Sequence, residues 1–99
     1  MILLARSVGI AKGKNAGAVA QAKAVVDYLK EKMGADIEVG VPVGRSPMRI
    51  VWISRHDNMG SLEEAFDTMA TDAAFQELVA KGLDNFVEGS MEDRIVKFI

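Results

Sequence analysis

The segment MRIVWISRH, residues 48–56, decides the fold of this chain. Successive side chains of a β-strand point to opposite faces. Residues 50–53 are apolar at every position, so a strand formed here is apolar on both faces. Strands of this kind lie at the centre of a sheet, where both faces are covered, and strands with one polar face lie at the edges. We therefore predict that residues 48–56 form a central strand.

A second segment with two apolar faces lies at the start of the chain, in a predicted strand over residues 1–9. Two further strands are predicted with only one apolar face, residues 37–43 and residues 93–99. Residues 44–47, Gly-Arg-Ser-Pro, are typical of a turn that joins the second and third strands into a hairpin. Placing the two-sided strands inside and the one-sided strands outside predicts an antiparallel sheet with strand order 4-1-3-2.

Two segments between the strands have helical periodicity. The first follows Asn15, a candidate N-cap, and is expected to end at Gly34, a natural helix stop. The second is expected to begin with a capping box formed by Ser61 and Glu64. The phase of its apolar stripe shifts near Asp72, which predicts a break in the helix there.

This order of elements predicts an α+β, ferredoxin-like βαββαβ fold in one domain over residues 1–99. Right-handed crossovers place both helices on the same face of the sheet. The opposite face is then predicted to carry an uncovered apolar patch made of Ile2, Leu4, Val8, Ile50 and Trp52. Apolar patches of this size usually mark an interface, and two sheets packed with twofold symmetry would cover both copies. We expect a homodimer formed through the sheet face.

The composition argues against several classes of function. A net charge of -2, with both signs interspersed, gives no electrostatic surface for nucleic acid or for an anionic membrane. The sequence has no Cys and one His, so disulfides and Cys-ligated metals are excluded and we expect no metal and no cofactor. No apolar stretch approaches the roughly 18–20 residues that span a bilayer. We expect a cytoplasmic protein.

The whole chain resembles the dimeric α+β barrel superfamily, in which two ferredoxin-like subunits pack their sheets into one barrel. Besides the order of elements, the resemblance rests on SLEEAF at 61–66, DAAF at 72–75 and GSMEDRI at 89–95. The superfamily includes cofactor-free monooxygenases, haem-degrading enzymes, isomerases, stress-response proteins and small-molecule-binding regulatory domains. The Asn–Trp–His set of the haem-degrading members is not matched in full here. The resemblance therefore implies a fold and leaves the activity open.

Candidate site residues lie on the two predicted central strands. Trp52, Ser54 and His56 share one face, and an aromatic wall with a few polar groups is typical of a ligand site. Trp52 is alternatively part of the core of a dimer interface. His56, the only histidine, is a candidate general base, or alternatively a solvated residue at the strand end. Arg6 is expected to point into the barrel, where it either pairs with a carboxylate of the protein or holds an anionic ligand.

Two functions follow from these residues. The first is a homodimeric binding protein that holds a small, mainly apolar or amphipathic molecule, such as one with a carboxylate, between sheet and helices. Its ligand-binding residues would be Arg6, Trp52, Ser54 and His56. The alternative is a cofactor-independent monooxygenase or isomerase with His56 as the catalytic base. A plainer third interpretation is a structural or regulatory dimer without a ligand.

Overall fold

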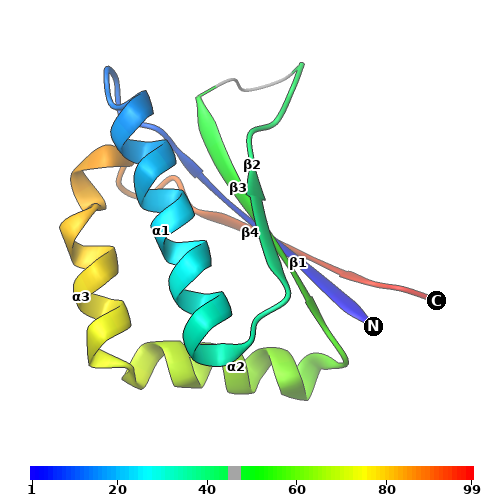
Figure 1. The fold of residues 1–99 in the computed structure, drawn as a ribbon. Helices are drawn as coiled ribbons and strands as arrows, with labels where there is room; N and C mark the ends of the chain where they lie inside the picture. The colour runs from blue at the N-terminus through cyan, green and yellow to red at the C-terminus, as the bar shows by residue number, and fades with distance from the viewer. Residues whose placement is uncertain (45–47) are drawn as a thin grey trace.

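The computed structural model describes residues 1–44 and 48–99, which form a four-stranded antiparallel sheet with three α-helices on one of its faces (Figure 1). The strands are β1 (Ile2–Gly9), β2 (Ile37–Gly40), β3 (Arg49–His56) and β4 (Glu92–Lys97). The helices are α1 (Asn15–Met33), α2 (Met59–Thr71) and α3 (Ala73–Lys81), followed by the 3-10 turn η1 (Leu83–Asn85). The strand order β2-β3-β1-β4 is the predicted 4-1-3-2 order counted from the other edge, so the ferredoxin-like α+β fold is confirmed.

The two strands with two apolar faces lie at the centre of the sheet, as predicted. β1 pairs with β3 along its whole length, from Ile2 opposite His56 to Gly9 opposite Arg49. β2 and β4 form the two edges, and both are shorter than predicted because β2 ends at Gly40 and β4 covers residues 92–97. The predicted turn at residues 44–47 lies largely outside the described residues.

The starts of the first two helices differ from the prediction. Asn15 is the first residue of α1 and Lys14 holds the cap position, without a side-chain hydrogen bond. α2 begins before the predicted capping box, because the Asn58 side chain accepts a hydrogen bond from the backbone N–H of Ser61 at 2.9 Å. The predicted cap at Ser61 is therefore wrong. Asn58 accepts from an unpaired N–H group of the first turn, so the helix begins one turn earlier than predicted.

Both predicted helix interruptions are confirmed. Gly34 ends α1 in the left-handed conformation, with φ of 61°, which costs glycine little. The helix is interrupted at Asp72, whose backbone is extended. The Asp72 carboxylate accepts a hydrogen bond from the N–H of Phe75 at 3.0 Å and so caps α3. The break turns the chain so that α3 lies beside α1 while α2 crosses one end of the sheet (Figure 1).

The assignment of the two sheet faces was predicted the wrong way round. The residues expected on the uncovered face, Ile2, Leu4, Val8, Ile50 and Trp52, all face the helices. Alternation along a strand tells which side chains share a face, but not which face receives the helices. The helices cover the face with the larger apolar side chains, since this buries more apolar surface.

The opposite face of the sheet has no covering element among residues 1–44 and 48–99. The strand register places smaller aliphatic side chains along its centre. We call this surface the outer face and define it by Leu3, Ala5, Val51, Ile53 and Val96. These residues remain half-buried or exposed. The sheet face without helices is therefore still apolar at its centre, as the sequence predicted, although other residues form it.

The contact between α2 and β1 depends on Leu62, which is 1% exposed and packs against Ile2 and Leu4. Replacing Leu62 with alanine should lower the free energy of unfolding by about 2–5 kcal/mol, because the lost packing leaves a void. Leu83→Ala is the matched control, since Leu83 is 60% exposed and its loss should change stability by at most about 0.5 kcal/mol. Urea denaturation measures both values, and equal losses in the two variants would contradict this account of the packing.

Candidate ligand-binding site

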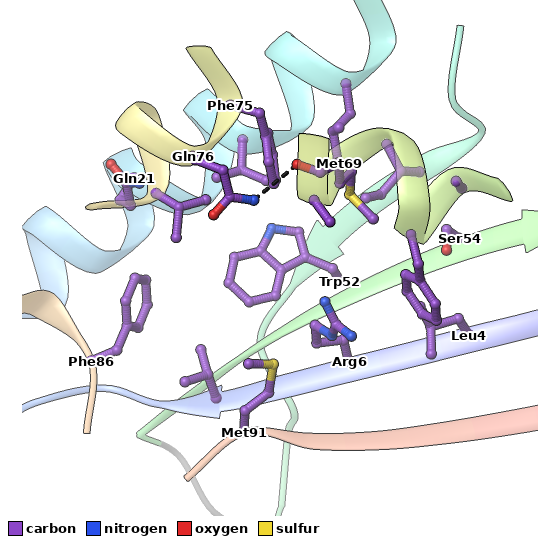
Figure 2. Close-up of a pocket in the computed structure, with 18 of the residues that line it drawn as sticks. Leu4, Arg6, Gln21, Trp52, Ser54, Met69, Phe75, Gln76, Phe86 and Met91 are labelled. Carbon is purple, nitrogen blue, oxygen red and sulfur yellow. Dashed lines mark hydrogen bonds between the residues drawn. The ribbon is translucent and has the colours of Figure 1, made fainter. Parts of the chain in front are cut away.

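A cavity of about 1050 Å³ lies between the sheet and the helix layer. β1 and β3 form its floor, and side chains from all three helices and from the segment before β4 form its walls (Figure 2). The four residues predicted to bind a ligand, Arg6, Trp52, Ser54 and His56, all line it. The structure therefore brings the predicted set together in one place, between the sheet and the helices.

The cavity exists because the helix layer does not follow the sheet closely along its whole width. α1 packs directly on β2 and β3, while α3 packs mainly on α1 and α2 is joined to the sheet near one end. Small side chains on α2, Ala65 and Ala70, face the space that remains. Most of the lining is apolar, and the aromatic rings of Phe66 and Phe75 form part of the wall.

Trp52 projects from β3 into the middle of this space (Figure 2). Its indole N–H donates to the carbonyl of Ala22 on α1 at 3.3 Å, and its ring makes an edge contact with Phe86, with 6.2 Å between ring centres. The interpretation of Trp52 as dimer-interface core is wrong, since the side chain faces the protomer's own helices. Trp52 is held by α1 and presents its remaining aromatic surface to the cavity.

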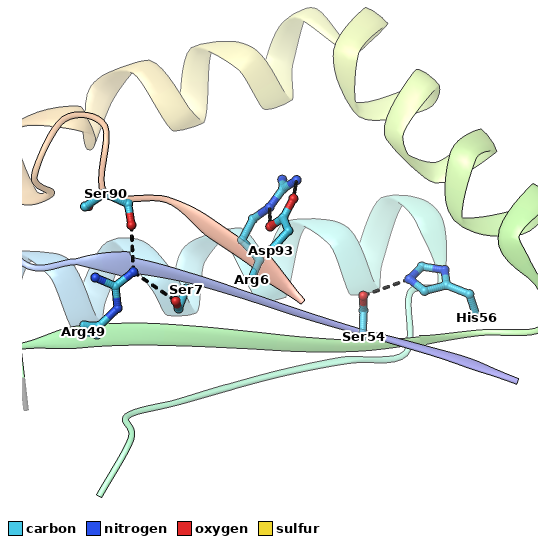
Figure 3. A network of polar contacts seen from close by, with 7 residues as sticks. All are labelled: Arg6, Ser7, Arg49, Ser54, His56, Ser90 and Asp93. Atoms are coloured by element: carbon cyan, nitrogen blue, oxygen red, sulfur yellow. Dashed lines mark hydrogen bonds and ion pairs between the residues drawn. The ribbon is translucent and has the colours of Figure 1, made fainter. Parts of the chain in front are cut away.

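Ser54 and His56 form a hydrogen-bonded pair on the same floor (Figure 3). The Ser54 hydroxyl oxygen lies 2.8 Å from Nε2 of His56, and Ser54 is 8% exposed. Which of the two groups donates depends on the imidazole tautomer. The hydrogen bond holds the ring against the strand and leaves Nδ1 available for another partner.

The expectation that Arg6 points into a barrel between two sheets is wrong, because Arg6 projects from β1 toward the helices, where it pairs with Asp93 on β4 (Figure 3). Nε donates to one Asp93 oxygen at 2.7 Å and Nη2 to the other at 2.8 Å. The guanidinium carbon also lies 5.1 Å from the centre of the Phe66 ring. Arg6 was expected to pair either with a carboxylate of the protein or with an anionic ligand, and in the structure it pairs with the carboxylate of Asp93. These hydrogen bonds hold the pKa of Asp93 below its ordinary value, against the opposing effect of partial burial.

The sequence analysis missed two acidic residues that organise this region, Asp93 and Asp72. Asp93 was predicted only as the start of a strand, because its position opposite Arg6 follows from the β1–β4 register. Asp72 was predicted only as a helix break, yet it also accepts hydrogen bonds from the hydroxyl of Tyr28 at 2.8 and 3.0 Å. The Phe75 N–H, and then the Tyr28 hydroxyl, lower the pKa of Asp72. The carboxylate in turn raises the pKa of Tyr28.

The pairing of Tyr28 with Asp72 ties α1 to the junction of α2 and α3. Tyr28 and Phe75 also lie in ring contact, with 5.8 Å between their centres. Phe75 and Val79, which follow the junction on α3, line the cavity. The start of α3, which forms part of the cavity wall, is thus held to α1 by the hydrogen bond between Tyr28 and Asp72 and by the ring contact between Tyr28 and Phe75.

Other polar groups around the cavity are used within the fold. The Gln21 amide N–H donates to the carbonyl of Leu78, and the Gln76 amide N–H donates to the carbonyl of Met69 (Figure 2). Within residues 1–44 and 48–99 there is no cluster of three or more His, Asp and Glu side chains that could hold a metal ion. Over the same residues, no helix is long and apolar enough to cross a membrane.

Comparison with known proteins places this geometry in a structural class. No protein-family model and no curated protein matches the chain. A NIPSNAP family protein from Agrobacterium tumefaciens has a TM-score of 0.81 at 16% identity, covering 97% of this chain and 90% of that one. An antibiotic biosynthesis monooxygenase-like protein from Bordetella bronchiseptica has a TM-score of 0.75 at 15% identity, covering 99% and 96%. The chain shares its ferredoxin-like fold with these solved structures.

A further NIPSNAP-like domain protein, from Burkholderia xenovorans, has a TM-score of 0.82 at 10% identity and covers 99% of this chain and 84% of that one. The predicted resemblance to dimeric α+β barrel proteins is thereby confirmed at the level of the fold. Identities this low say nothing about substrate or activity, so the function has to be argued from the cavity and its residues.

Proposed function

We propose that the protein is a cytoplasmic homodimer that binds a small, mainly apolar molecule in the cavity between its sheet and its helices. The observation that carries this proposal is an apolar space of about 1050 Å³ with Arg6, Ser54 and His56 on its floor. Ligand sites are typically concave, largely apolar and roughly 300–1,000 Å³ in volume, with a few polar groups that orient the ligand. The cavity matches this description in size and in lining.

The lining also indicates how such a ligand lies. Its apolar body packs against Trp52 and against the aromatic and aliphatic side chains of the helices. Its polar end lies near Arg6, the one lysine or arginine that lines the cavity within the described part of the chain. An amphipathic molecule with one oxygen-bearing end fits this distribution of groups.

Filling the cavity should abolish binding. Ala65 lines the space from α2, so Ala65→Phe should weaken the binding of the apolar dye Nile red at least about tenfold by occupying its volume. Ala80→Phe, an exposed change on α3 outside the cavity lining, should leave binding unchanged. Fluorescence titration of the dye measures both affinities. Wild-type protein that does not bind the dye, or equal weakening in both variants, would reject the cavity as the binding site.

The dimer is proposed to form through the outer face. Two arginines that flank its apolar centre are engaged within the protomer. Arg49 donates to Ser7 and to the carbonyl of Ser90 and lies 3.8 Å from Glu92, and Arg55 lies within 3.5 Å of Asp36 and 3.3 Å of Glu38. An apolar centre with a polar rim is the usual composition of a protein–protein interface. A second copy related by twofold symmetry covers this centre on both subunits.

A charge in the middle of the outer face should separate the subunits. Val51→Asp places a carboxylate among apolar side chains, where burial without a partner is costly, so the mass in solution should fall from twice 10.7 kDa to 10.7 kDa. Val43→Asp introduces the same charge at a position that is 92% exposed and should leave the dimer intact. Light scattering coupled to gel filtration measures the mass. A monomeric wild-type protein at micromolar concentration would contradict the proposed dimer.

A second candidate function is a cofactor-independent monooxygenase or isomerase, and it is favoured by one observation, the pairing of Ser54 with His56 on the cavity floor. In the tautomer in which Nε2 donates to the Ser54 oxygen, Nδ1 keeps a lone pair that can accept a proton from a bound substrate. Structural similarity to the monooxygenase-like protein from Bordetella bronchiseptica is in keeping with this candidate.

His56→Ala separates the two candidate functions. If His56 is the base, the variant should lose turnover by at least about 100-fold while it still binds Nile red, since general-base catalysis typically contributes that much. His56→Gln is the matched variant, because it keeps a hydrogen-bonding group near Ser54 but cannot act as a base. Oxygen uptake with hydroxylated aromatic substrates is the assay. Unchanged turnover in either variant would exclude His56 as the base.

A further inference from the structure

The basic group on the cavity floor is neutralised by a residue that does not itself line the cavity. Among the described lining residues is Arg6 but not its partner Asp93, which lies on the neighbouring edge strand β4. We propose that this arrangement makes the cavity select a ligand with a neutral oxygen acceptor, such as an amide, ketone or ester carbonyl, over a carboxylate, and that Asp93 sets the choice. The inference rests on the ligand-binding function proposed above and names its substrate class.

The geometry leaves Arg6 able to donate hydrogen bonds into the cavity. A guanidinium has five N–H donors, and Asp93 accepts from Nε and from one N–H of Nη2. Within residues 1–44 and 48–99, no protein acceptor engages the remaining N–H groups on Nη1 and Nη2. In Figure 2 the Arg6 guanidinium lies beside Trp52 at the cavity floor. A ligand oxygen can therefore be bound without displacing Asp93.

The position of the guanidinium is held from two sides. The bidentate pairing with Asp93 sets the plane of the group, and its carbon lies 5.1 Å from the ring centre of Phe66 on α2. A planar group held in this way loses little further freedom when it donates to a ligand. The low pKa of Asp93 keeps its carboxylate ionised at neutral pH, so the pair persists under ordinary conditions.

The charges around the cavity disfavour an anion. Asp84 and Glu88 also line it, while Arg6 is the one lysine or arginine among its described lining residues. A carboxylate bound to the free N–H groups of Arg6 would lie close to Asp93 and would be repelled by it. It would also lose its hydration in a mainly apolar space, which is expensive for an ion. A neutral carbonyl gains a charge-assisted hydrogen bond from Arg6 without either cost.

Octanamide and octanoate test this selection, because they have the same chain and nearly the same shape and differ in charge. Their dissociation constants are measured at pH 8 by displacement of Nile red from the protein. The wild type should bind octanamide at least about tenfold more tightly than octanoate. Asp93→Asn removes the neutralising charge and should reduce or reverse this ratio, by about tenfold or more in favour of octanoate. Asp27→Asn, the same change at an exposed position on α1, should leave the ratio unchanged.

The outcomes separate the two proposals. Tighter binding of octanoate by the wild type would overturn the inference while leaving the ligand-binding function standing. An unchanged ratio in Asp93→Asn, with a thermal transition like that of the wild type, would also overturn it, because Asp93 would then not set the choice. Failure of the wild type to bind Nile red and both octanoyl compounds would reject the ligand-binding function and this inference with it.

Discussion

The close packing of α1 on β2 and β3 is the constraint on which the rest of the structure depends. Ala18 and Ala22, both 0% exposed, let the helix approach Ile50 on β3 closely. Val26 and Leu29 continue this contact toward β2. Because α3 is attached to α1, and α2 reaches β1 mainly through Leu62, the helix layer is anchored on one half of the sheet and at one end. The space left over β1 is the cavity.

Three polar pairs link elements of this arrangement through hydrogen bonds. Tyr28 and Asp72 join α1 to the break between α2 and α3, and Ser54 and His56 hold each other on the floor. Arg6 and Asp93 connect the centre of the sheet to its exposed edge strand β4. Of their members, Arg6, Ser54 and His56 line the cavity, so part of the hydrogen-bonding capacity of its floor is used within the protein.

The same floor supports both candidate functions, and the difference between them lies in what the polar groups do. For a binding protein, Arg6 orients one end of the ligand and Trp52 provides an apolar surface. For an enzyme, His56 must in addition take a proton, with Ser54 fixing its tautomer. The outer face takes part in neither candidate function, since its side chains alternate with those of the cavity floor along the strands and point away from the cavity. The proposed dimer interface and the proposed ligand site therefore lie on different faces of one sheet.

The sequence alone determined the features that depend on local periodicity. The apolar run at residues 50–53 placed β3 at the centre of the sheet, and the shift of phase near Asp72 located the helix break. Trp52, Ser54 and His56 are alternate residues of one strand, so the sequence placed their side chains on one face. Only the tertiary structure decided which face receives the helices and that Asp93 lies opposite Arg6. These depend on packing and strand register between segments far apart in the chain, and alternation within one strand is the same whichever face becomes buried.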